Sequence, residues 1–358
     1  NVFTGECSLA EKHLDKCLNL SISNEYEVLL TISENLETEK FYSLAVKYYE
    51  KAYRINQNDP VLWYDLAYCY EKISKNKKSI RFYLKYLNEI PYSEHAWFNL
   101  GTVYNKKGLY EKAVNAFDYA IAINEGYDSA VFNKANALAN AGKYKEAIRT
   151  YLDFLRKERN NADAFCYIGE CYERLGQYKR AILYFKKAIR INYSMPDAWY
   201  GLGLIYFYTD QIYESYYHFK TAVQHNKREP EYWYALGKAA SVINLIEEAM
   251  IAFNKATELD PYDNEFWISY SELLMDNQRV GEAIKVLSNG YEYIPESASI
   301  NYHMAACLLK NNNTQRALQY FESGLTLDYN KHVEFFNIIP EAKKSDKIRK
   351  LIAKHKKC

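Results

Sequence analysis

The sequence repeats itself with a period of 34 residues, nine times in succession, between residues 26 and 331. Five tryptophans mark the period most clearly, because each lies a whole number of periods from the next: Trp63, Trp97, Trp199, Trp233 and Trp267. A fixed period of roughly 20–50 residues is typical of a solenoid, in which each unit buries its apolar face against its neighbours. Solenoids present long binding surfaces, so the period favours binding over catalysis.

Small residues recur at two positions of every unit. With residue 26 as position 1 of the first unit, position 8 is Gly, Ala or Ser throughout, position 20 is Ala or Ser, and position 24 is large and apolar. Positions 4, 7, 8 and 11 share one face of a first helix, and positions 20, 24 and 27 share one face of a second. Facing small residues let two helix axes approach closely, and the large residue at position 24 fills the space beside them.

Two stretches carry a known repeat pattern almost whole. They are residues 96–124, AWFNLGTVYNKKGLYEKAVNAFDYAIAIN, and residues 198–223, AWYGLGLIYFYTDQIYESYYHFKTAV. Their spacing W-x2-L-G-x2-Y followed by A-x3-F resembles the tetratricopeptide-repeat (TPR) family. The resemblance covers residues 26–331 and implies an all-α fold, a right-handed α-solenoid (superhelix) of antiparallel helix pairs. It also implies a concave groove lined by the first helix of each unit.

The period predicts three parts of the chain. Residues 1–25 are expected to be an N-terminal capping helix or the remnant of an earlier repeat, because residues 7–20 have the pattern of an amphipathic helix. Nine TPR units follow: 26–59, 60–93, 94–127, 128–161, 162–195, 196–229, 230–263, 264–297 and 298–331. Residues 332–358 are expected to form C-terminal capping helices with a basic tail. We favour a solvated cap for that tail over a patch for an acidic partner or nucleic acid.

The resemblance places positions 2, 5, 6, 9, 12 and 13 of each unit in the groove. Aromatic residues occupy position 5 in six of the nine units and offer apolar area to an extended peptide, although the same rings could instead pack between neighbouring units. Asparagines at positions 6 and 9 offer donors and acceptors to a peptide backbone. The predicted peptide-binding residues are Tyr64, Phe98, Asn99, Phe132, Asn133, Asn136, Glu170, Tyr200, Tyr234 and Tyr302.

The charges at the groove positions are skewed. These positions hold thirteen acidic residues and five basic ones, although the whole chain has a net charge of only +1. A groove of negative potential favours a basic or apolar-basic protein segment and repels nucleic-acid phosphates. The predicted partner is therefore a protein or peptide and not a nucleic acid. No membrane span is predicted, because the sequence has no run of about 18 apolar residues.

No catalytic motif is present in the sequence. It contains no HExxH, no Cys/His zinc spacing, no GxSxG and no Walker sequence, so no catalytic, metal-binding or cofactor-binding residue is predicted. Cys69, Cys171 and Cys307 share position 10, where other units have small apolar residues. Core cysteines of this kind fit a reducing compartment, which favours the cytoplasm.

The predicted function is a non-enzymatic protein–protein interaction scaffold that binds a partner segment in an aromatic, acidic groove. Two alternatives stay open. The first is a self-associating assembly module, a homo-oligomer formed through residues 1–25. The second is the recognition arm of a longer enzyme or regulator, because the sequence begins with Asn1 and not with Met.

Overall fold

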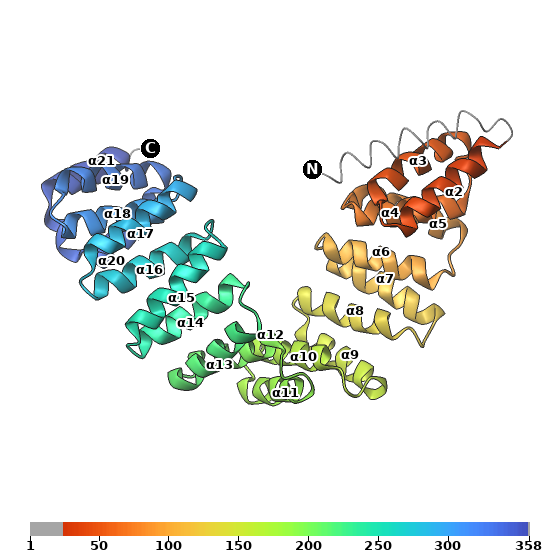
Figure 1. The fold of residues 1–358 in the computed structure, drawn as a ribbon, viewed down its shortest axis with the longest axis horizontal. Coiled ribbons are helices and arrows are strands. Elements are labelled where there is room, and N and C mark those ends of the chain that lie inside the picture. The colour runs from red at the N-terminus through yellow and green to blue at the C-terminus, as the bar shows by residue number, and fades with distance from the viewer. Residues whose placement is uncertain (1–23, 357–358) are drawn as a thin grey trace. The chain divides into compact units, whose positions relative to one another are not determined.

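The computed structural model describes residues 24–356 and consists there of α-helices joined by short turns, with two short 3-10 helices and no strand (Figure 1). Consecutive helices form antiparallel pairs, because the turns that join them are only a few residues long and reverse the chain direction. The protein is therefore an all-α solenoid of helix pairs, as the period predicted.

The helices fall into two alternating series. The first helices of the pairs are α2 (Glu25–Thr38), α4 (Pro60–Lys72), α6 (Glu94–Lys106), α8 (Asp128–Asn140), α10 (Ala162–Arg174), α12 (Pro196–Tyr208), α14 (Pro230–Val242), α16 (Asn264–Asp276) and α18 (Ala298–Lys310). The second helices are α3 (Tyr42–Ile55), α5 (Asn76–Glu89), α7 (Tyr110–Ile123), α9 (Tyr144–Lys157), α11 (Tyr178–Ile191), α13 (Ile212–His225), α15 (Ile246–Leu259), α17 (Val280–Tyr293) and α19 (Thr314–Leu327). After them come η1 (Tyr329–Lys331), α20 (His332–Ile338), η2 (Pro340–Lys344) and α21 (Asp346–His355).

The chain divides into two compact units, the first ending at Gly176 and the second beginning at Gln177. The N-terminal unit holds the helices up to α10, and the C-terminal unit holds α11 to α21. Each unit has an apolar core between its helix pairs, around Leu66 in the first and Phe253 in the second. The division of residues 26–331 into nine repeats stays a prediction. The helix predicted within residues 7–20 lies outside the described residues.

Every helix pair reverses through a residue in the left-handed region at position 15, with φ between 57° and 76°. These residues are Lys40, Ser74, Gly108, Gly142, Gly176, Asp210, Asn244, Gln278 and Asn312. In the turn at Gly108, for example, the following N–H, that of Leu109, donates to the Tyr104 carbonyl five residues back at 2.9 Å, which satisfies a free helix-end carbonyl. Glycine predicts this turn in three units. In the other six the same turn forms in spite of a Cβ atom, so its geometry is set by the helix pair and not by glycine alone.

The tryptophans at position 4 tie each first helix to the turn before it. In all five, the indole N–H donates to the backbone carbonyl six residues earlier at 2.8–3.0 Å. In the last pair Asn301 stands at this position, and its amide reaches the Pro295 carbonyl at 3.4 Å. The tryptophans that mark the period in the sequence thus have a structural role. Each indole packs in its repeat and also donates a hydrogen bond to a backbone carbonyl.

The last helix pair is covered by the chain that follows it. Phe335 and Phe336 of α20 join one apolar cluster with Tyr302, Phe321 and Leu325. Lys354 of α21 pairs with Glu322 of α19 at 2.7 Å. The end of the solenoid therefore does not expose the apolar face that a further repeat would bury.

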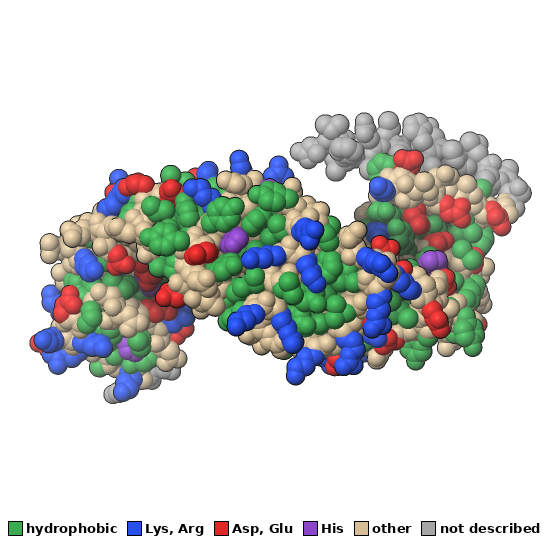
Figure 2. All heavy atoms as spheres, turned by 90° about the horizontal axis from the view of Figure 1, so that it is seen from below, with side chains coloured by type: hydrophobic (Ala, Val, Ile, Leu, Met, Phe, Trp, Pro, Cys, Tyr) green, Lys and Arg blue, Asp and Glu red, His purple; other side chains and the backbone are tan. Residues whose placement is uncertain are grey.

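Exposed hydrophobic side chains lie among Lys and Arg side chains on the face seen in Figure 2. In the C-terminal unit the exposed members on the second helices include Leu183 of α11 and Tyr213 and Tyr217 of α13. Because second helices turn this surface to solvent, it is distinct from the surface of the first helices that the repeat pattern assigns to the groove.

Candidate ligand-binding groove

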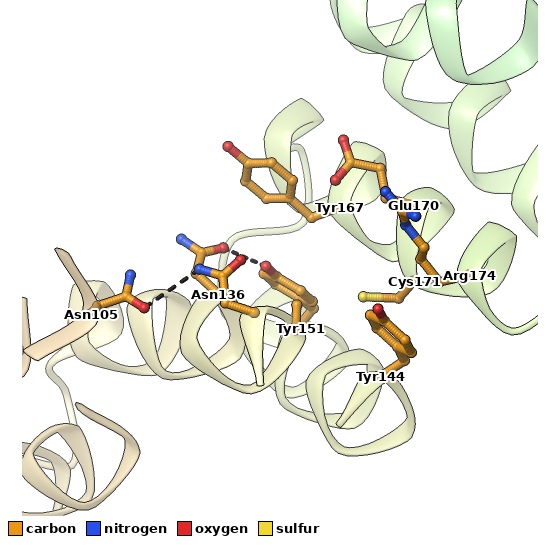
Figure 3. Close-up of a pocket in the computed structure, with 10 residues that line it drawn as sticks. Asn105, Asn136, Tyr144, Tyr151, Tyr167, Glu170, Cys171 and Arg174 are labelled. Atoms are coloured by element: carbon orange, nitrogen blue, oxygen red, sulfur yellow. Dashed lines mark hydrogen bonds between the residues drawn. The ribbon is translucent and has the colours of Figure 1, made fainter. Parts of the chain in front are cut away.

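A polar pocket of about 480 Å³ lies in the N-terminal unit between α8 and α10, with further side chains from α6 and α9 (Figure 3). We call it the asparagine pocket. Its lining residues are Asn105, Asn136, Ala139, Asn140, Tyr144, Tyr151, Tyr167, Glu170, Cys171 and Arg174. Two of them, Asn136 and Glu170, belong to the predicted set.

Hydrogen bonds orient the amides of the asparagine pocket. The hydroxyl of Tyr151, on the second helix α9, donates to the side-chain oxygen of Asn136 (Figure 3). Asn140 donates through its side-chain nitrogen to the side-chain oxygen of Asn105 at 3.4 Å. Because this bond identifies the oxygen of Asn136 as the acceptor, it fixes the orientation of the amide, whose NH2 group carries two donors. The pocket is thus a set of positioned amides.

The α10 side of the pocket carries one charge of each sign. Glu170 and Arg174 lie four residues apart, so they share one face of the helix, and both are exposed. Burial, followed by the nearby Glu170 carboxylate, raises the pKa of the Cys171 thiol to about 12. The thiol is therefore protonated near neutral pH.

A second polar pocket, of about 330 Å³, lies against another part of the same helices. Phe132 and Asn133 line it together with Asp128, Ser129, Phe154, Glu158, Asn161 and Asp163. The amide of Asn133 donates to the Ser129 carbonyl of its own helix at 2.8 Å. Asn99 belongs to neither pocket, and its amide donates to the Tyr64 hydroxyl at 3.0 Å. The predicted amides of Asn99, Asn133 and Asn136 thus lie at three different sites and do not form one continuous row.

The rings at position 5 all pack on the ring at position 24 of the same unit, with ring centres 5.6–5.8 Å apart. The pairs are Tyr64–Tyr83, Phe98–Phe117, Phe132–Tyr151, Tyr200–Phe219, Tyr234–Phe253 and Tyr302–Phe321. Five of the position-5 rings are half-buried and keep part of their surface exposed.

Tyr302 departs from this pattern. Its side chain is completely buried and its hydroxyl donates to the Asp328 carbonyl at 2.9 Å. The cause is the packing of α20 on the last helix pair, which the repeat pattern does not contain. We therefore remove Tyr302 from the candidate groove.

Acidic side chains gather in the first two helix pairs, but they carry less charge than their number indicates. Burial raises the pKa of Asp65 to about 7, and the carboxylates of Glu37 and Glu34 add to the effect. The buried Glu71 is paired with Lys106 at 2.7 Å. Near neutral pH this part of the groove is therefore less negative than a count of acidic residues predicts.

The C-terminal unit has a pocket at the same repeat positions, about 380 Å³ in volume, between α14 and α16. There Lys238 replaces Asn136, Glu272 replaces Glu170, and Asp276 replaces Arg174. Glu272 lies 3.2 Å from the ring nitrogen of His303, and this hydrogen bond lowers the pKa of Glu272. Each compact unit thus has a polar pocket between first helices, with a different set of charges.

Sequence reasoning missed several residues that line the asparagine pocket. Asn105, Tyr167, Asn140 and Arg174 lie at positions 12, 6, 13 and 13, all of which are groove positions, so the positional rule alone could have found them. Tyr151 could not be found in this way. It belongs to the second helix and reaches the groove only through its hydroxyl.

Models of known protein families match several parts of the repeat region. Tetratricopeptide-repeat models match residues 48–81, 95–127 and 132–196, and the TPR domain of cytochrome c-type biogenesis protein H matches residues 210–328. The chain is a tetratricopeptide-repeat protein. TPR proteins are protein–protein interaction scaffolds and are generally not enzymes. No curated protein matches this TPR chain as a relative.

Three solved structures are similar to this chain to different degrees. The APC/C hetero-tetramer Cut9–Hcn1 has a TM-score of 0.52 at 17% identity, covering 86% of this chain and 59% of the other. YrrB, a TPR protein with an unusual peptide-binding site, has a TM-score of 0.46 at 19% identity, covering 55% of this chain and 98% of YrrB. Yeast Tom70 has a TM-score of 0.42 at 16% identity, covering 92% and 88%.

Two negative findings hold for residues 24–356. None of the helices there has the length and apolar character that crossing a bilayer requires. The same residues contain no group of three or more His, Cys, Asp or Glu side chains placed to hold a metal ion.

Proposed function

We propose that this TPR protein holds an extended segment of a partner protein in the groove of its first helices, with the asparagine pocket as the main recognition site. The observation that carries the proposal is the set of three amides, those of Asn105, Asn136 and Asn140, around one pocket of about 480 Å³. A side-chain amide offers two donors and one acceptor, which match the C=O and N–H groups of an extended peptide. Such a peptide brings backbone groups that need partners once they leave water.

Besides the amides, an aromatic ring and a carboxylate in the groove are proposed to contact side chains of the partner segment. The half-buried ring of Phe132 lies beside the second pocket and keeps surface for an apolar side chain. The exposed carboxylate of Glu170 in the asparagine pocket favours a Lys or Arg of the partner segment. We therefore expect a segment that combines apolar and basic residues.

The cysteines support a binding role in a reducing compartment, and we keep the cytoplasm as part of the proposal. Cys69, Cys166, Cys171 and Cys307 are buried thiols that form no disulfide within residues 24–356. Burial also raises the pKa of the Cys307 thiol to about 12, so this thiol stays protonated near neutral pH. These groups act as small core residues, and we propose no catalytic role for them.

Capture from a source-cell lysate tests the proposed function. The intact chain is compared with the variant Asn105→Ala/Asn136→Ala/Asn140→Ala and with a matched variant, Asn115→Ala/Asn254→Ala/Asn289→Ala, which changes three exposed asparagines of second helices. We expect one partner to be retained by the intact chain and the matched variant and lost from the pocket variant. Equal recovery by all three proteins would contradict the assignment of the site, and recovery of the chain itself would favour self-association.

A further inference from the structure

Among the second helices that the structure describes, α11 is the one without an acidic residue. It carries Lys179, Arg180, Lys186, Lys187 and Arg190 and no acidic residue. All five side chains are exposed. The neighbouring second helix α13 carries one Lys and one Glu, and α15 carries one Lys and three Glu. The period therefore does not require this excess of positive charge.

Elsewhere in the protein, ion pairs between successive second helices balance such charges. Lys78 of α5 pairs with Glu50 of α3 at 3.0 Å, and Lys220 of α13 pairs with Glu248 of α15 at 3.3 Å. In the described part of the C-terminal unit, no carboxylate forms an ion pair with Lys179, Lys186 or Arg190. Lys186 and Arg190 are also one helical turn apart, where like charges repel each other. Within the described part of this unit, the charges of Lys179, Lys186 and Arg190 are thus not balanced by an ion pair of the kind seen at Lys78 and Lys220.

The basic side chains surround one exposed apolar residue. Residues 179, 180, 183, 186, 187 and 190 fall on a single face of the helix, and Leu183 lies at its centre. Leu183 is 53% exposed. Seven residues separate Lys179 from Lys186, a distance of about 10 Å along the helix axis. We call these six residues the α11 face, and Figure 2 shows Lys and Arg around hydrophobic side chains on this side of the protein.

We propose that the α11 face docks an acidic amphipathic helix of a partner protein. Such a helix places carboxylates seven residues apart, opposite Lys179 and Lys186, and an apolar residue between them, opposite Leu183. Nucleic-acid phosphates would match the charges but offer no apolar group to Leu183. An anionic membrane would require a wider apolar surface than one leucine. The site lies on second helices, so it is separate from the proposed peptide groove.

Binding of a designed probe tests this proposal. The probe is a fluorescent helical peptide with glutamates at i, i+1, i+7 and i+8 and a leucine at i+4, and the control is a scrambled peptide of the same composition. We expect saturable binding to the intact chain that weakens as salt is added, because the charges are at the surface. The Lys179→Glu/Lys187→Glu variant should lose at least about tenfold in affinity.

A matched variant separates the α11 face from a general loss of positive charge. Lys77→Glu/Lys255→Glu changes exposed lysines at the same two repeat positions on α5 and α15, and it should lose less than about twofold in affinity. Leu183→Ser, which keeps every charge, should weaken binding about threefold or more and provides the test should the charge reversal prevent folding. Equal losses in the two lysine variants, equal binding of the scrambled peptide, or a preference for an RNA oligonucleotide or phosphatidylserine vesicles would overturn the proposal.

Discussion

The hydroxyl of Tyr151 donates a hydrogen bond to the side-chain oxygen of Asn136, so a buried ring of the second helix α9 orients an amide in the groove of the first helices. The equivalent ring of the second helix pair, Tyr83, is also fully buried, but its hydroxyl makes no hydrogen bond of normal geometry within the described chain, because the nearby Asn99 amide donates to the Tyr64 hydroxyl at 3.0 Å. A tyrosine at the same repeat position thus orients a groove amide in one repeat and leaves its hydroxyl without a hydrogen bond in another.

Removing the Tyr151 hydroxyl should weaken the groove without changing the fold. Tyr151→Phe leaves the ring, and phenylalanine already occupies position 24 in five other units. We expect the free energy of unfolding to fall by about 0.5–1.5 kcal/mol, because one hydrogen bond is lost, and binding of the captured partner to weaken several-fold. Urea denaturation and a binding titration measure the two effects.

Tyr83→Phe is the matched change with the opposite expected sign. It removes a buried hydroxyl that makes no hydrogen bond, so the free energy of unfolding should rise by about 0.5–1 kcal/mol. Partner binding should stay as in the intact chain. A destabilisation by Tyr83→Phe equal to that by Tyr151→Phe would show that the hydroxyl of Tyr83 is satisfied in solution.

Gly203 should not tolerate a large side chain. A Cβ atom at this position would lie 2.5 Å from the ring of Phe219, which is below any normal contact. Gly203→Leu should therefore lower the free energy of unfolding by about 2–3 kcal/mol through overpacking. Gly281→Leu in α17 meets open space and should stabilise the protein by about 0.5 kcal/mol through helix propensity. Similar effects of the two substitutions on urea unfolding would refute the close helix contact.

Asp65 should make the protein less stable as the pH rises. Its pKa is raised to about 7 by burial and by Glu37 and Glu34, whereas an unfolded aspartate titrates near 4. Between these values the folded state holds a proton that the unfolded chain releases, so stability is lost as the pH rises toward and through 7. Asp65→Asn should therefore raise the free energy of unfolding at pH 8 by about 1–2 kcal/mol and have little effect at pH 4.

Urea denaturation at the two pH values checks the Asp65 prediction. The exposed Asp153 provides the control, since Asp153→Asn should change stability little at either pH. If Asp65→Asn had the same effect at pH 4 and pH 8, the carboxyl of Asp65 would not hold its proton in the folded state.

The sequence was sufficient to predict the helix pairs, because the requirements for packing recur in every unit. The small residue at position 8 and the ring at position 24 meet as expected, as for Gly237 and Phe253, where an added Cβ would lie 2.8 Å from the ring. The left-handed turn residues were harder to predict. Lys40 and Gln278 adopt φ of 64° and 61° without being glycine, so residue type alone did not identify them.

The candidate site was predicted less completely than the fold, and the reason is physical. The repeat pattern assigns residues to a face, but it does not say which side chains on that face use their polar groups within the protein. Asn99 donates to the Tyr64 hydroxyl and Asn133 to the Ser129 carbonyl, both outside the asparagine pocket, whereas the hydrogen bond from Asn140 to Asn105 joins two residues that line it. The burial of Tyr302 depends on α20, which lies beyond the last repeat and follows no period.

Photo-crosslinking from one tyrosine position tests the central claim most directly. A photoreactive phenylalanine analogue replaces Tyr167 in the asparagine pocket, and in a second protein it replaces Tyr92, an 83% exposed tyrosine in the turn after α5. Both positions lie in the N-terminal unit. After illumination with source-cell lysate, we predict a crosslinked partner from position 167 and none from position 92. A crosslink from position 92 alone would contradict binding in the groove.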